Sequence, residues 1–210
     1  MKIRSMLASV LFKLTLFVLA ALGVLLSCNV FAGKADWGAL RQYAVLANAL
    51  CAVFYLISAI RGLFNNREFQ PRIRGGAIML LCVLAVCDLA FYRTQRSGSL
   101  TYLLLHVATL VLALIDWLLF GEKNHYRWRS PLLWMIVPNL YFLYVILRLK
   151  LLGGGCLMAF LNYQTLGVGK VLINLLIVNL FSLAAGFLFV SIDMLLMKRK
   201  KKRRKSKKSK

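Results

Sequence analysis

The feature that most constrains this chain is a series of apolar blocks, each long enough to cross a lipid bilayer. The hydrocarbon layer is roughly 30 Å thick, and a helix needs about 20 residues to cross it. Of the 210 residues, 61% are hydrophobic and only 16% are charged, whereas a soluble domain carries about 25% charged residues. The sequence therefore predicts an integral membrane protein.

Six such blocks are separated by charged or turn-forming residues, and they make up one predicted domain over residues 1–197. They show no alternation of period two, which argues against a β-barrel. Backbone polar groups in lipid must be hydrogen-bonded within their own segment, so the blocks are predicted to be helices. The expected fold is an all-α, polytopic bundle of six transmembrane helices. The predicted spans cover approximately residues 7–31, 42–60, 76–92, 100–120, 132–147 and 171–197.

The distribution of lysine and arginine predicts the orientation, because cytoplasmic loops are enriched in these residues. With the N-terminus inside, 20 of the 28 basic residues fall in cytoplasmic segments and seven fall outside, and Lys13 alone lies within a span. Arg72 and Arg74 belong to the basic loop that is expected before the third span. Both termini are therefore predicted to be cytoplasmic, in a multi-pass protein of the cell membrane.

A competing interpretation concerns the first block, where Val30, Phe31 and Ala32 fit a signal peptidase site. Cleavage there would leave five spans and would move one terminus to the other side of the membrane. The apolar run over residues 14–32 is longer than an ordinary signal-peptide core, which favours a retained first span.

The last thirteen residues, 198–210, include eleven lysines and arginines and no apolar residue. Such a segment has nothing to bury and is predicted to be disordered. We expect it to lie against anionic lipid headgroups. Nucleic-acid binding is not favoured, because no aromatic residues are interleaved with the basic ones to stack on bases.

The five cysteines show none of the paired spacings that are typical of metal or redox sites. Cys28 and Cys156 are predicted to lie near the outer face, where a disulfide could form. We otherwise expect the cysteines to pack as small apolar residues. The sequence predicts neither a metal site nor a cofactor.

One face of the fourth span is polar in otherwise apolar surroundings. At 100° per residue, Tyr102, His106, Thr109 and Asp116 fall on the same side of a helix. Ionisable residues in a membrane usually face the interior of the bundle. His106 and Asp116 are separated by about 15 Å along the helix at 1.5 Å per residue, so they are not expected to pair with each other.

Other spans also carry polar residues that are expected to face the interior of the bundle. Asn48 in the second span and Asn179 in the sixth join Tyr102 and Asp116 in the predicted polar interior. A neutral imidazole needs a partner for each ring nitrogen. We therefore expect His106 to be neutral and hydrogen-bonded to a neighbouring helix, with the second span as the predicted partner.

Two further residues interrupt the apolar pattern. Asp88 lies near the outer end of the third span, where Arg93 and Arg96 are within reach. Pro138 is expected to interrupt the fifth span, because proline lacks a backbone N–H and frees a carbonyl of the preceding turn.

The sequences of the fourth and fifth spans resemble those of a known family of membrane proteins. LHVATLVLALIDWLLF, over residues 105–120, and RWRSPLLWMIVPNLYFLYVILR, over residues 127–148, resemble the bacterial six-span branch of the androgen-induced membrane protein family. QYAVLANAL, over residues 42–50, resembles that family's second span. The resemblance implies a helical bundle. It also implies a relation to animal members that cleave fatty acid esters of hydroxy fatty acids with an intramembrane threonine and a histidine.

The resemblance places the family histidine at His106, as a candidate catalytic base, and the family threonine at Ala44. Alanine has no hydroxyl group, so the nucleophile of the family mechanism is missing. Thr109 is a weak substitute, and Thr101 and Ser58 are further alternatives. The resulting expectation is a degenerate or non-catalytic lipid-binding member with a fatty acyl ligand. An active hydrolase of fatty acid esters, a small transporter and a structural membrane protein remain alternatives.

Overall fold

The computed structural model describes residues 2–65, 70–92, 99–123, 125–153 and 155–208, without the side chains of residues 2–5, 65 and 197–208. Within these ranges the chain is helical, and six of its segments are long and apolar enough to cross a membrane. The chain is thus an all-α, six-span bundle, as the lengths of the apolar blocks predict. Four spans contain the long helices α1 (Lys2–Ser27), α2 (Tyr43–Asn65), α3 (Pro71–Phe91) and α9 (Val168–Lys208).

The fourth and fifth spans are each built from more than one helix. The fourth consists of α4 (Leu100–Tyr102), the π-helical turn η4 (Leu103–Ala108) and α5 (Thr109–Phe120). The fifth consists of α6 (Ser130–Trp134) and α7 (Ile136–Leu152). The break at Met135 lies three residues before Pro138, because a proline ring clashes with the carbonyl group four residues earlier. Short helices η1 (Val30–Ala32), η2 (Trp37–Arg41), η5 (Ala159–Leu161) and α8 (Tyr163–Leu166) complete the described chain.

Several predicted span boundaries differ from the observed ones, and two of them have a clear cause in the local sequence. The first span ends at Ser27 and not at residue 31, because Asn29 (φ 52°) adopts a left-handed backbone conformation that ends a helix. The third span begins at Pro71 and not at residue 76, since proline is favoured in the first turn of a helix. This earlier start places Arg74, predicted to be a loop residue, inside a membrane-spanning helix.

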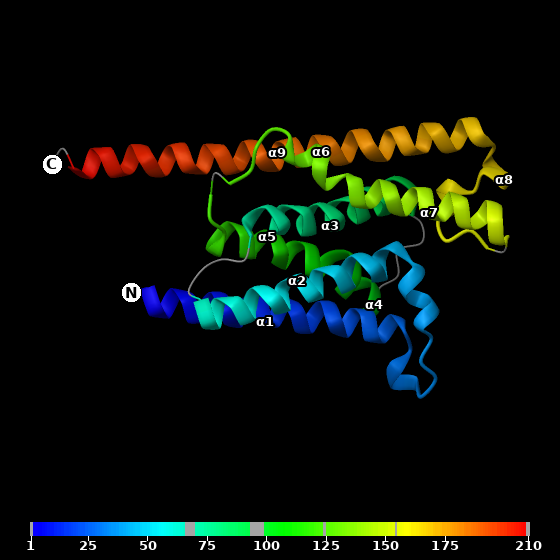
Figure 1. Ribbon diagram of the computed structural model, residues 1–210, viewed down its shortest axis with the longest axis horizontal. Coiled ribbons are helices and arrows are strands. Elements are labelled where there is room, and N and C mark those ends of the chain that lie inside the picture. Colours follow the sequence, from blue (N-terminus) through cyan, green and yellow to red (C-terminus); the bar gives the residue numbers. More distant parts are fainter. Residues whose placement is uncertain (1, 66–69, 93–98, 124, 154, 209–210) are drawn as a thin grey trace.

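The helices run roughly along the long axis of the molecule, and both termini lie at the same end (Figure 1). We call this the terminal end, and we call the other the distal end, where η1, η2, η5 and α8 lie (Figure 1). α1 packs along α2, and α3 contacts α2, α5, α6, α7 and α9. The largest share of buried residues among the six spans belongs to α3. It is therefore the most central of the six spans.

Helix α9 continues to Lys208, through most of the basic segment 198–210 for which the composition predicts disorder. Lysine and arginine are good helix formers, and the segment contains neither glycine nor proline, so nothing in its local sequence ends the helix.

Because both termini lie at the terminal end of the bundle (Figure 1), they are expected on the same side of the membrane. A reporter fused after Lys210 is expected to be cytoplasmic, because most basic residues flank the terminal end. A reporter inserted after Gly155, between α7 and α9, is expected on the opposite side. Protease protection and cysteine accessibility in intact cells measure both positions. Finding the two reporters on the same side would contradict the six-span arrangement.

Candidate functional site

The distal end of the bundle contains a cavity of about 400 Å³ beside His106. This volume falls within the range of about 300–1,000 Å³ that is usual for small-molecule sites. We call it the His106 cavity. Its lining residues come from α2 and α3, from the residue before α2 and the residue after α3, from the fourth span and from the segment after α7: Gln42, Tyr43, Ala44, Leu84, Cys87, Asp88, Tyr92, Tyr102, His106, Cys156, Leu157 and Met158.

Three of these residues form a connected group. The Tyr102 hydroxyl donates a hydrogen bond of 2.6 Å to Asp88 Oδ2. Asp88 Oδ1 lies 3.7 Å from His106 Nδ1, which is an electrostatic contact longer than a hydrogen bond. The rings of Tyr102 and His106 stack with centroids 4.5 Å apart and planes inclined by 16°. Tyr102 thus contacts both the carboxylate and the imidazole.

The π-helical turn η4 carries His106, and two of its backbone carbonyl groups accept hydrogen bonds from side chains. Asn48 on α2 is fully buried, and its Nδ2 donates hydrogen bonds to Leu105 O at 3.0 Å and to Ala44 O at 2.8 Å. Thr109 Oγ1 donates to Leu104 O at 2.9 Å. Single π-helical turns frequently occur at functional sites. Here the Asn48 and Thr109 side chains bond the two carbonyl groups that directly precede His106.

The polar partner of His106 differs from the predicted one. The sequence favours a hydrogen bond from the second span, but the imidazole faces Asp88 on α3. The second span instead supports the backbone of η4 through Asn48. Arg93 and Arg96, the predicted partners of Asp88, lie outside the described residues.

The predicted nucleophile positions have different surroundings. Ala44 lines the same cavity as His106. Thr109 is fully buried, does not line the cavity and donates its hydroxyl to a backbone carbonyl. Thr101 and Ser58 do not line it either. Among the described residues of the cavity wall there is neither a serine nor a threonine.

Tyrosines supply the other hydroxyl groups of the wall. Tyr43 donates to Leu80 O at 3.1 Å. The Tyr92 oxygen accepts a hydrogen bond of 3.1 Å from the backbone N–H of Ala159. Burial is the main cause that raises the pKa of Tyr92 above its usual value. This phenol therefore stays protonated at neutral pH and can donate a hydrogen bond.

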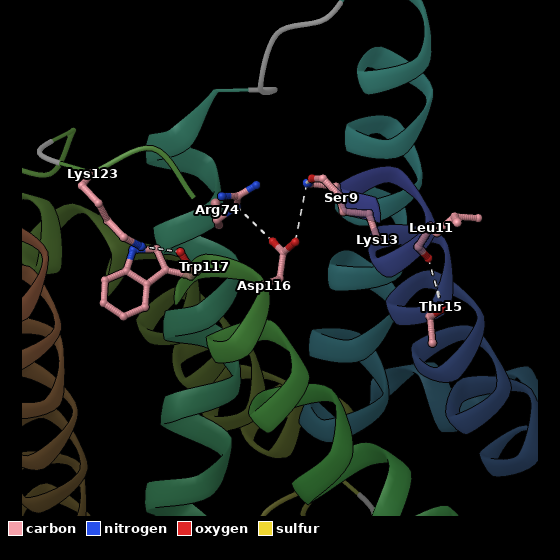
Figure 2. Close-up of polar contacts among 8 residues, drawn as sticks. All are labelled: Ser9, Leu11, Lys13, Thr15, Arg74, Asp116, Trp117 and Lys123. Atoms are coloured by element: carbon pink, nitrogen blue, oxygen red, sulfur yellow. Dashed lines mark hydrogen bonds and ion pairs between the residues drawn. The ribbon is translucent and has the colours of Figure 1, made fainter. Parts of the chain in front are cut away.

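Asp116, near the C-terminal end of α5, belongs to a second group, which Figure 2 shows. Lys13 Nζ on α1 lies 3.5 Å from Asp116 Oδ1, and Arg74 Nε on α3 lies 3.4 Å from Asp116 Oδ2. The Lys13 ammonium group also donates to Ser9 Oγ. The exposed fractions of the side chains are 7% for Lys13, 1% for Arg74 and 0% for Asp116. We call these three residues the charged cluster.

The charged cluster joins three helices through one carboxylate. Removing two cations and an anion from water is costly unless they are paired, so each member depends on the others. Lys13 and Asp116 are visible in the sequence as charges within apolar spans. Arg74 was missed as a member, because sequence alone places it in the loop ahead of α3.

The last predicted interior residue, Asn179, connects α9 to α7. Its side chain and that of Asn139 exchange two hydrogen bonds, of 2.9 Å and 3.2 Å. Asn179 also donates to Leu175 O. This half-buried pair holds two helices together and is separate from the His106 cavity.

All five cysteines are free, including Cys28 and Cys156. Within the part of the chain that the structure describes, no three His, Cys, Asp or Glu residues gather in a way that could hold a metal ion. Comparison with family models, with curated proteins and with solved structures finds no match to this chain.

Proposed function

We propose that this protein binds a fatty acyl ligand in the membrane, with the ester or hydroxyl group of the ligand in the His106 cavity. The observation that carries this proposal is the group of Tyr102, Asp88 and His106 at the wall of a cavity within an apolar bundle. Ligand sites are usually apolar with a few polar groups that fix the orientation. Leu84, Leu157 and Met158 supply the apolar part of this wall.

We further propose that the chain belongs to the bacterial six-span branch of the androgen-induced family. The segments at residues 42–50, 105–120 and 127–148 support this membership. It is also supported by the position of Ala44 and His106 on the wall of one cavity. In this interpretation the family threonine has been lost, and the lipid-binding site has been kept.

The cell membrane is the proposed location, with cytoplasmic termini and the basic segment 198–210 against anionic headgroups. A small transporter is the alternative class. Asp116 would then be a titrating site, but its place between Lys13 and Arg74 favours a structural role.

Ligand binding is tested with the purified full-length protein in detergent and a fluorescent long-chain ester. We expect saturable binding that Leu157→Trp weakens at least tenfold, because the indole would occupy the cavity. His106→Ala should weaken binding severalfold through the loss of a polar partner. Val107→Ala is the matched control, since Val107 adjoins His106 and is 42% exposed. Equal binding by all variants would contradict the proposal.

Restoring the family hydroxyl is a separate test. Ala44→Thr is expected to give hydrolysis of long-chain esters above the level of the unchanged protein, and a second change, His106→Ala, should remove that gain. The reason is that a nucleophile needs a base within hydrogen-bond reach. A folded Ala44→Thr protein with no gain would count against the position that the resemblance assigns to Ala44.

A further inference from the structure

Beyond binding, and resting on the ligand site proposed above, we infer that Asp88 and His106 form a general-base pair that activates water to hydrolyse an ester in the cavity. Asp88 is a positioning residue, and His106 is the group that accepts the proton.

The first observation concerns the two nitrogens of His106. Nδ1 is buried and faces Asp88, yet 20% of the side chain is exposed. His106 also lines the cavity, so part of its side chain can contact a ligand there. A neutral imidazole has one N–H donor and one acceptor. A proton on Nδ1, toward the carboxylate, leaves Nε2 as the acceptor, which is the tautomer that a general base needs.

The second observation is that Asp88 is oriented by a separate residue. Tyr102 donates to Oδ2 at 2.6 Å, and Oδ1 is the oxygen that lies nearest to His106. Tyr102 also stacks on the imidazole, which restricts rotation of that ring. The 3.7 Å separation of Oδ1 and Nδ1 is long for a hydrogen bond. Contacts of this kind are commonly long without substrate and shorten when it binds.

The third observation concerns the nucleophile. The described wall of the cavity has no aliphatic hydroxyl group, and the Tyr102 and Tyr43 hydroxyls donate to Asp88 and to Leu80 O. The Cys156 thiol donates to Met158 O at 3.1 Å, and Cys87, the other thiol of the wall, is almost completely buried at 1% exposed. Water is then the nucleophile of the proposed reaction. Tyr92 is a donor on the same wall for the oxygen on which negative charge develops.

The proposed reaction balances without any other reactant. The water oxygen attacks the ester carbonyl carbon while its proton passes to His106 Nε2. The bond between that carbon and the alcohol oxygen then breaks, and Nε2 returns the proton to the leaving alkoxide. The products are a carboxylic acid and an alcohol. No bond to the protein forms, and nothing is oxidised or reduced.

The test uses full-length protein in liposomes with a long-chain 4-methylumbelliferyl ester. We expect His106→Ala to lower kcat by about 10²–10⁴-fold, the usual contribution of a general base. Asp88→Asn should lower kcat with little change in KM and should alter the pH profile of kcat, which a purely structural role would not do. Tyr102→Phe keeps the stacked ring and should have a smaller effect. Val107→Ala again serves as the control.

Two outcomes overturn the inference. The first is saturable ester binding with no turnover, which leaves the proposed ligand site intact and removes only the catalytic step. The second is a covalent acyl adduct on the protein, detected by mass spectrometry of rapidly quenched samples. Absence of both binding and turnover would instead contradict the proposed function itself. Turnover in ¹⁸O-labelled water without an adduct is the expected result.

Discussion

Replacing Asp116 with alanine is expected to lower the free energy of unfolding by about 3–5 kcal/mol, the usual cost of removing one partner from a buried ion pair. The change takes away the carboxylate that the ammonium group of Lys13 and the guanidinium group of Arg74 share, at 3.5 Å and 3.4 Å. Both cations are almost completely buried, so water cannot replace the lost anion. Denaturant titration of the purified protein in one detergent measures the effect.

Two control variants test whether the loss of stability in Asp116→Ala comes from the buried charges. Lys13→Met leaves Arg74 and Asp116 as a pair of equal and opposite charges, so it should cost clearly less than Asp116→Ala. Glu122 lies close to the same end of α5 but is 57% exposed, with His125 Nε2 at 2.9 Å. Glu122→Ala should cost no more than about 1 kcal/mol, as exposed pairs contribute little. Equal losses for Asp116→Ala and Glu122→Ala would show that the charged cluster does not stabilise the fold.

The second large effect is expected at Gly75. A Cβ atom built at this position overlaps the ring of Trp134 at Cζ2, and Trp134 Nε1 is itself held by a hydrogen bond of 3.1 Å to Arg72 O. Gly75→Ala should therefore destabilise the protein by about 1–3 kcal/mol, the usual cost of overpacking. The measurement is the shift of the unfolding midpoint in the same titration.

Gly169 is the matched control, because it lies in α9 and a Cβ atom there meets nothing within 4 Å. Alanine is favoured over glycine inside a helix by about 1 kcal/mol. Gly169→Ala should thus be neutral or stabilising, with the opposite sign to Gly75→Ala. A stabilising Gly75→Ala would contradict the close packing of α3 against α6.

The six spans could be predicted because a segment that crosses a bilayer must be long, apolar and helical, and few other structures fit such a sequence. Their ends were less predictable. Arg74 looks like a loop residue until Pro71 is known to start α3, and Asp116 on α5 lies 3.4 Å from its guanidinium group. The pattern of residues within one segment does not show which residue of another segment lies next to it.

For the candidate site, too, the sequence does not show which residues of different helices lie together. Helical periodicity places His106 on a polar face but does not say which helix faces it. The π-helical turn at Leu103–Ala108 also adds a residue to the turn, so a regular helical wheel misjudges the positions on either side. Asp88 was noticed as an isolated charge, yet its contact with His106 depends on how α3 packs against the fourth span.

The central claim is that the His106 cavity holds the polar group of a fatty acyl ligand. A long-chain ester that carries a diazirine beside its carbonyl group tests it most directly, by photolabelling of the full-length protein in liposomes and peptide mapping. We predict adducts at the distal end of α3 and in the segment of Cys156 and Met158, with strong loss in Leu157→Trp. Adducts confined to exposed apolar residues such as Leu140 and Leu180, unchanged by Leu157→Trp, would contradict the claim.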